Sequence, residues 1–254
     1  MQVRNFLDND DVKVIAEQGA FKVIEWQRDL SVGYTDAVTA YFASEMNVRR
    51  RQLVCTLNGQ NGVVTQAGAM QWTMGNVQAT TGVKGVGDFV GKLARGAVTG
   101  ESAVKPEYVG QGTLVLEPTW KHVLLLDNVQ HMGGGMVVND GFFYACDSTI
   151  KHKAVPVSRP SAMIAGGEGL FNLGLQGAGV VALESPVPMS EIVIVDLEND
   201  ELKVDGNFAI AWTPGLQFTV ERSGKSLLGS AASGEGLVNV YRGVGRVLLT
   251  PTAA

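Results

Sequence analysis

Gly167-Glu168-Gly169-Leu170 belongs to a motif that recurs along the chain at a constant interval. Gly100-Glu101-Ser102-Ala103 lies 67 residues before it, and Gly234-Glu235-Gly236-Leu237 lies 67 residues after it. A composite pattern in three copies predicts an internally triplicated fold. The candidate structural residues of the repeat are therefore Gly100, Glu101, Gly167, Glu168, Gly234 and Glu235. Each copy is followed by a glycine pair and a short apolar run, and the pairs are Gly110 with Gly112, Gly177 with Gly179, and Gly243 with Gly245.

A second block precedes the glycine pairs and supports the same periodicity. The segment 69–75 (AMQWTMG) is similar to the segment 209–215 (AIAWTPG), and both contain a tryptophan. The middle copy, 138–146, is more diverged and has Cys146 where the others have tryptophan. The repeated units are therefore residues 51–118, 119–186 and 187–251.

The segments between the turns have the length and pattern of β-strands. Val123-Leu124-Leu125-Leu126 and Ile192-Val193-Ile194-Val195 are four-residue apolar runs, too short for buried helices. Apolar and polar residues alternate over 217–222 and 148–153, as in sheets with one face in water. The sequence thus predicts an all-β body of three antiparallel units in a pseudo-threefold arrangement, similar to a β-prism or a double-stranded β-helix. A single unit would leave its sheet edges open.

The first fifty residues lie outside the repeats and form an N-terminal extension, so that residues 51–254 make up a single β domain. Residues 12–26 are expected to form strands, and residues 36–48 a short helix with Thr35 or Asp36 as its N-cap. Arg49-Arg50-Arg51 closes the extension. We interpret this basic triplet as a solvated helix end favoured by the helix dipole, with a phosphate or acidic-partner site as the alternative.

The segment 85–100 (GVGDFVGKLARGAVTG) interrupts the β-pattern, since its apolar residues follow helical spacing. Its glycines predict a weak helix. One interpretation is a connection that packs over one end of the first unit. The alternative is an amphipathic contact with a partner or a membrane surface, made by Phe89, Lys92, Leu93 and Arg95.

Composition restricts the class of protein. Of the 254 residues, 45% are hydrophobic and 18% are charged, which provides for a buried core and excludes a disordered chain. The 32 glycines lack the period of three that collagen requires. A formal net charge of −5 gives no general attraction to nucleic acid. Two isolated cysteines, no signal peptide and no apolar run of about 20 residues predict a soluble, cytoplasmic protein.

No arrangement of residues predicts catalysis or a bound cofactor or metal. The sequence has three histidines, and their spacing is not that of a metal site: they are His122, His131 and His152. Nucleophile-elbow, CxxC and phosphate-loop motifs are absent from the sequence. Threefold symmetry would bring Glu101, Glu168 and Glu235 to equivalent positions, where they could hold a cation. The simpler interpretation is that each glutamate accepts backbone N–H groups within its own turn.

These blocks resemble the family of altered inheritance of mitochondria protein twenty-four, which has bacterial and mitochondrial members and is described as TRAP-like (tryptophan RNA-binding attenuator-like). The resemblance runs from about residue 50 to the end and rests on the segments 66–70, 85–100, 100–102 and 167–171. It implies a TRAP-like all-β body and no enzyme, because the family has no agreed catalytic residues to transfer. Its mitochondrial members are associated with inner-membrane organisation and respiratory-complex assembly. RNA or tryptophan binding does not follow from a fold analogy.

These features together predict a non-catalytic scaffold or interaction protein, which the resemblance links to membrane-associated complexes. Protein partners or self-association as a homo-oligomer are expected, with Trp72, Trp120 and Phe171 as candidate surface contacts. Membrane contact would be peripheral at most. A small-molecule or glycan-binding β-prism is the alternative class, and a metal-dependent β-barrel enzyme is a third. Repeats that share glycines and one glutamate favour the scaffold, because lectin repeats usually repeat their polar binding residues.

Overall fold

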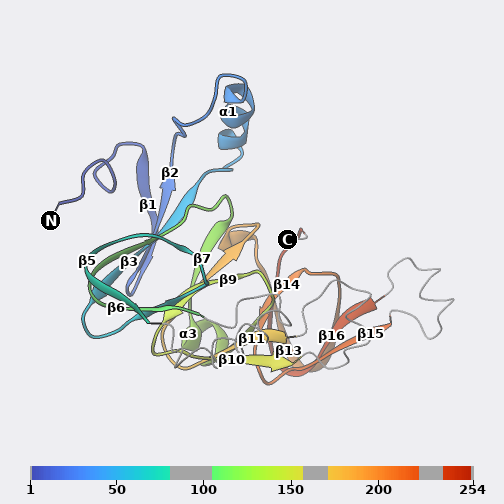
Figure 1. Cartoon of the computed structure of the whole chain (residues 1–254). Helices are drawn as coiled ribbons and strands as arrows, with labels where there is room; N and C mark the ends of the chain where they lie inside the picture. The colour runs from blue at the N-terminus through green and yellow to red at the C-terminus, as the bar shows by residue number, and fades with distance from the viewer. Residues whose placement is uncertain (1, 81–104, 157–170, 223–236, 253–254) are drawn as a thin grey trace, which may run out of the picture.

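The computed structural model of the chain describes residues 2–80, 105–156, 171–222 and 237–252. The described residues lie mainly in antiparallel strands, which form two curled sheets and confirm the prediction of an all-β protein (Figure 1). The helical elements of this part are short, and they are α1 (Ala37–Glu45), α3 (Asn128–Met132) and one 3-10 turn at Met189–Glu191.

The first sheet, sheet A, has nine strands in the order β1-β2-β3-β6-β4-β9-β12-β7, with β5 paired to β6 outside this path. The bounds are β1 Val12–Gln18, β2 Phe21–Trp26, β3 Arg51–Asn58, β4 Val63–Thr65, β5 Met70–Thr80, β6 Glu107–Leu116, β7 His122–Asp127, β9 Phe143–Asp147 and β12 Val180–Ser185. Because β2 pairs with β3 from Phe21 opposite Cys55 to Glu25 opposite Arg51, the N-terminal hairpin continues the sheet of the first unit.

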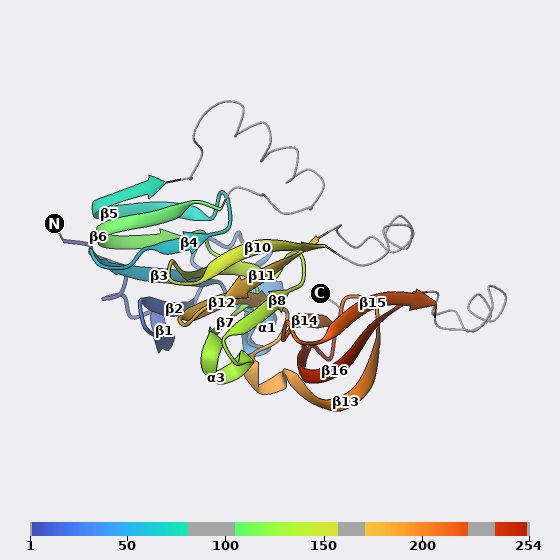
Figure 2. The ribbon, with the colours of Figure 1, turned by 90° about the horizontal axis from the view of Figure 1, so that it is seen from below.

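The second sheet, sheet B, has seven strands in the order β10-β11-β8-β14-β16-β13, with β15 paired to β16 outside this path. The bounds are β8 Gly135–Val138, β10 Lys151–Pro156, β11 Phe171–Gln176, β13 Val193–Asp205, β14 Ala209–Trp212, β15 Gln217–Arg222 and β16 Leu237–Leu249. Figure 2 shows β10 with β11, and β15 with β16, as two neighbouring ribbons that point the same way from the body.

Two apolar cores explain why the sheets curl and pack. The core inside sheet A draws buried residues from seven strands, including Phe21, Leu53, Val63, Leu114, Val123, Tyr144 and Ala182. The turn between β1 and β2 approaches β12 across this core, since a Cβ on Gly19 would lie 3.3 Å from Val180. The second core joins the two sheets, and its members include Leu126, Phe143, Leu183, Met136, Leu175, Ile210 and Leu248. Burial of these side chains is the main force that holds the sheets together.

The three predicted units are distributed unevenly over the sheets. Strands β3 to β6 of the first unit lie in sheet A, and strands β13 to β16 of the third lie in sheet B. The second unit is divided, because β7, β9 and β12 join sheet A whereas β8, β10 and β11 join sheet B. The pseudo-threefold prism stays a prediction.

Two local predictions are confirmed. The N-terminal helix α1 begins directly after its N-cap Asp36, and it ends before Asn47, which has a left-handed φ of 61°. Gly110, a member of a predicted glycine pair, has a φ of 115°, and a Cβ there would overlap the carbonyl oxygen of Asn76 on β5. Glycine is therefore required where β5 and β6 approach closely.

Candidate functional site

Residues 27–50 form an arm that leaves sheet A between β2 and β3 and carries α1 (Figure 1). The helix forms over a stretch that contains three alanines, the residue with the highest helix propensity. Both ends of the arm are anchored in adjacent, paired strands. The arm is therefore a fixed extension of sheet A.

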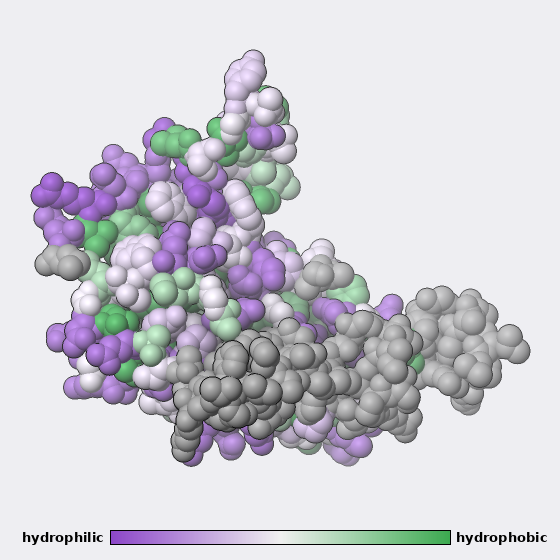
Figure 3. Space-filling view, viewed as in Figure 1, coloured by the Kyte–Doolittle hydropathy of each residue, from purple (hydrophilic) through white to green (hydrophobic). Residues whose placement is uncertain are grey.

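The arm exposes large apolar side chains. None of the nine residues of α1 is buried, and Phe42 is 64% exposed. Tyr34 before the helix and Met46 after it are 97% and 79% exposed. The other large exposed apolar residues of the arm are Leu30, Val38, Tyr41 and Val48. Hydrophobic side chains gather on this projecting part of the surface (Figure 3). A helix that is apolar around its circumference is normally buried, so this surface is suited to a partner.

A cavity of about 380 Å³ lies under the helix and shows that α1 does not pack closely on its own sheet. Its walls include Trp26 and Trp120 on the sheet side and Ala40 and Tyr41 on the helix. Trp120 is 55% exposed, as expected for the surface contact predicted there. The apolar surface of the arm thus extends from the helix to the sheet beneath it.

A buried ion pair holds the base of the arm. Arg51, at the start of β3, is 1% exposed, and its Nη2 lies 2.8 Å from the Oε2 of Glu25 on β2. Its Nη2 also donates to the carbonyl oxygen of Asn47 at 2.9 Å, which fixes the end of the arm. The interpretation of the basic triplet as a solvated helix end is wrong for Arg51. The register of β2 and β3 places it directly opposite Glu25, inside the sheet.

The other two arginines of the triplet are also engaged within the chain. Arg50 pairs with Asp29 at 2.8 Å and its guanidinium lies 5.5 Å from the ring centroid of Trp26. Arg49 lies 3.5 Å from Glu25 and donates to the side-chain oxygen of Gln27. These contacts orient the arm and pair each arginine of the triplet with a carboxylate, with Glu25 shared by two of them, so the phosphate or acidic-partner alternative finds no unpaired guanidinium in the triplet.

His122, at the start of β7, lies near this network. Burial and, to a smaller extent, the charge of Arg51 lower its pKa below the ordinary value of 6.5, and Glu25 opposes the shift. The unfolded chain therefore binds a proton on this histidine more readily than the folded chain. The contribution of neutral His122 to the free energy of unfolding is therefore complete above pH 6.5, and it is lost as the pH falls toward the lowered pKa.

We therefore expect the wild type to lose free energy of unfolding between pH 7.5 and pH 5.5, and His122→Asn to lose less over the same interval. Urea unfolding at the two pH values measures the difference. Equal losses in the two proteins would contradict the lowered pKa of His122.

Two groups of residues singled out from the sequence lie outside the described part of the chain. This applies to the partner or membrane contacts Phe89, Lys92, Leu93 and Arg95, and to the whole segment 85–100. It applies equally to the repeat-motif residues Gly100, Glu101, Gly167, Glu168, Gly234 and Glu235. The apolar surface of the arm was not predicted as a site, although the run AVTAYFA at 37–43, without a polar face, was a usable signal.

No group of three or more His, Cys, Asp or Glu side chains that could hold a metal ion occurs in the ranges 2–80, 105–156, 171–222 and 237–252. Cys55 and Cys146 are buried free thiols. Burial, with a smaller effect of Asp147, raises the pKa of Cys146 to about 12, so this thiol is a poor nucleophile at neutral pH.

All strands except β1 and β2, and the close approach at Gly110, belong to the part of the chain that is shared with known proteins. The model of the family described as mitochondrial biogenesis AIM24 matches residues 44–252. The chain belongs to the AIM24 family. The match begins at residue 44, so strands β1 and β2 and most of the arm precede it.

Relatives of this AIM24 chain occur in Streptococcus pyogenes. An uncharacterized protein of serotype M6 is 27% identical over 196 residues, which cover 74% of this chain and 75% of the relative. The crystal structure of a protein from the same species is similar with a TM-score of 0.60 and 26% identity, and the similarity covers 81% of this chain and 89% of that one. The AIM24 family membership and the fold are thus established together.

A membrane-spanning helix is not among the described elements, since none of them is both long and apolar enough to cross a bilayer.

Proposed function

We propose that this AIM24 chain is a non-catalytic scaffold or interaction protein that associates with a second copy of itself through the arm. The observation that carries the proposal is the exposed helix α1, which is apolar on both sides and has no buried residue. Leaving such a surface in water is unfavourable, and covering it is the main driving force for stable association.

A second copy is the occupant that the charges favour. Four arginines at the base of the arm share three carboxylates, through the pairs Arg28–Asp11, Arg49–Glu25, Arg50–Asp29 and Arg51–Glu25. Residues 27–50 as a whole carry three basic and three acidic side chains, so the arm has no net charge. The arm therefore offers little attraction for an anionic membrane or for nucleic acid. A twofold contact needs only one self-complementary surface, because the same apolar face is covered on both copies at once.

The body of the protein is proposed to be a TRAP-like arrangement of three repeats, located in the cytoplasm. The glycine pair 177/179 lies where the chain leaves β11 of sheet B and enters β12 of sheet A. The pairs 110/112 and 243/245 lie within the long strands β6 and β16. Glycines at matched positions would serve as bending points in each unit, which supports a common origin of the three units.

Self-association is tested by replacing an exposed valine in the arm. Val38 on α1 is 68% exposed, so Val38→Asp leaves the fold intact and places a charge on the apolar surface. We expect the wild type to sediment as a dimer and Val38→Asp to raise the dimer dissociation constant at least about tenfold. Val129→Asp is the matched control, because Val129 lies on α3 and is 50% exposed. A monomeric wild type, or equal effects of the two substitutions, would overturn the proposal.

A small-molecule-binding module is the second candidate function, and a cavity in sheet B favours it.

A further inference from the structure

A second cavity lies on sheet B, away from the arm. It has a volume of about 810 Å³ and lies between the turn that joins α3 to β8, strands β10 and β11, and the turn that joins β14 to β15. Cavities of about 300–1,000 Å³ are typical of small-molecule sites. Nothing in the proposed association of the arm uses this space.

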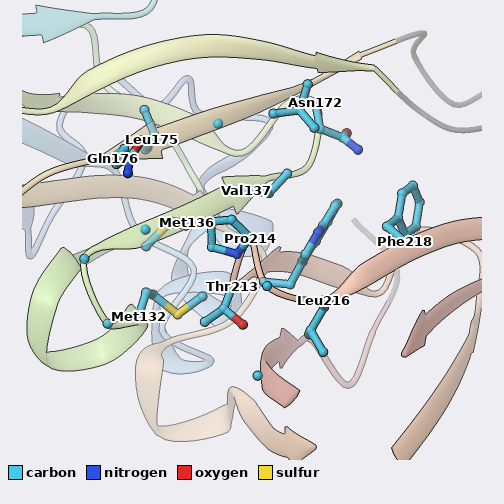
Figure 4. Close-up of a pocket in the computed structure, with 18 of the residues that line it drawn as sticks. Met132, Met136, Val137, Asn172, Leu175, Gln176, Thr213, Pro214, Leu216 and Phe218 are labelled. Atoms are coloured by element: carbon cyan, nitrogen blue, oxygen red, sulfur yellow. The ribbon is translucent and has the colours of Figure 1, made fainter. Parts of the chain in front are cut away.

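The walls of the cavity are mainly apolar. Met132 and Met136 lie at one side, toward Pro214, and Phe218 lies toward the other end (Figure 4). The two methionines are 2% and 0% exposed and form the closed back of the cavity, whereas Val155, Pro156, Pro214 and Phe218 contribute accessible apolar surface. Such a surface binds an apolar ligand body, such as an alkyl chain, by removing it from water.

Aromatic packing makes the floor of the cavity rigid. Trp212 lines the cavity but is only 2% exposed, because it packs against Phe218 and Tyr241 with ring centroids 5.0 Å and 5.2 Å away. Phe218 and Tyr241 complete the trio at 5.2 Å. The aromatic trio holds the β14–β15 turn in place, so the cavity is present without a ligand.

The charge of the cavity comes from one cation. Lys153 on β10 is the one charged side chain among the described residues of its lining. It pairs in register with Gly174 on β11, where an added Cβ would lie 3.4 Å from the Cγ of Lys153 and 2.8 Å from the Cγ2 of Val155. The lack of a side chain at Gly174 therefore lets the stem of Lys153 lie across the strand, on the face of β11 that lines the cavity.

The polar groups near this cation are amides. Asn172, 6% exposed, pairs with Val155 on the same two strands, and it lies at the same end of the cavity as Phe218 (Figure 4). Gln176 also contributes to the lining. Amide groups can donate to an anionic group beside a lysine and add no charge that would repel it.

We propose that this cavity binds a single-chain amphiphile with one anionic head group, with its apolar chain against the accessible apolar walls around Pro214 and Phe218 and its head group at Lys153. Apolar walls alone would accept any detergent-like molecule. Lys153 is a cation and the described lining contains no acidic residue, so the cavity favours an amphiphile with an anionic head group. This local positive charge contrasts with the net charge of −5 of the whole chain.

Isothermal titration calorimetry with dodecanoate below its micelle concentration tests the proposal on the full chain. We expect saturable binding of one molecule, with affinity falling about fourfold for each methylene removed, from dodecanoate to decanoate. Dodecyl phosphate is expected to bind as well, whereas dodecyltrimethylammonium, with the same chain and the opposite charge, is expected to bind at least about tenfold more weakly.

Two lysine variants separate the cavity from general charge effects. Lys153→Met is expected to weaken dodecanoate binding at least about tenfold and to remove the preference over dodecyltrimethylammonium. Lys151→Met carries the same substitution on the same strand, outside the lining, and is expected to bind as the wild type does. No saturable binding, unchanged binding by Lys153→Met, or an equal loss in Lys151→Met would overturn the proposal.

Discussion

Gly110→Ala is expected to lower the free energy of unfolding by at least about 3 kcal/mol and to remove the hydrogen-exchange protection of the β5 amides. The methyl group would overlap the carbonyl oxygen of Asn76, and the backbone at this position has a φ of 115°, which alanine rarely adopts. Strands β5 and β6 would have to separate at the residues where they are closest. Urea unfolding measures the free energy, and native-state hydrogen exchange of Asn76 and Val77 measures the pairing.

Gly68→Ala separates the steric overlap from backbone strain. Gly68 has a φ of 80°, but an added Cβ would meet no atom within 4 Å. Its replacement is expected to cost only about 1–2 kcal/mol, the ordinary cost of a left-handed conformation for a non-glycine residue. If Gly110→Ala proves no more costly than Gly68→Ala, the close approach of β5 and β6 is not what requires the glycine.

Arg51→Met is expected to destabilise the protein by about 3–5 kcal/mol, because it leaves the carboxylate of Glu25 buried without its main partner. The side chains of Arg51 and Glu25 are 1% and 8% exposed, so water cannot replace the lost ion pair. Arg49, 3.5 Å from Glu25, compensates in part and places the cost toward the lower end of this range. Equilibrium unfolding in urea measures the effect.

Two comparisons identify the cause of this loss. Arg28→Met removes a pair whose arginine side chain is 69% exposed, and it should cost much less than Arg51→Met because water replaces the lost contact. The double variant Glu25→Leu with Arg51→Met removes both charges and is expected to recover much of the stability lost by Arg51→Met alone. A double variant that is less stable than Arg51→Met would show that Arg51 acts by packing rather than by pairing with Glu25.

The strands could be predicted from sequence because their signals are local. The apolar run of 123–126 lies in β7, and the alternating segment 217–222 coincides with β15. The glycine pairs, such as Gly110 and Gly112, could also be predicted from the sequence, since a recurring glycine indicates a position that no other residue can occupy. The helix α1 was predicted from a candidate N-cap, Thr35 or Asp36, and from residues that recur on one side at helical spacing; the helix begins after Asp36, although the Asp36 side chain makes no capping hydrogen bond.

The site could not be predicted, because it depends on contacts that the sequence does not place. Burial of Arg51 follows from its position opposite Glu25, and that register is a property of the sheet. The exposure of Phe42 depends on which elements of the described ranges pack over α1, and none of them covers it, whereas an apolar helix usually packs on its own chain. The sheet B cavity brings together residues as distant as Met132 and Phe218, which no local pattern connects.

Self-association through the arm is tested most directly by disulfide cross-linking of Phe42→Cys. Phe42 is 64% exposed, and the native thiols of Cys55 and Cys146 are buried and do not interfere. Under mild oxidation, analysed on a non-reducing gel, a twofold contact is expected to give a covalent dimer of Phe42→Cys much faster than of Ile194→Cys, whose site on β13 is 46% exposed. Equal rates for the two variants, or no dimer of Phe42→Cys, would contradict the association of two arms.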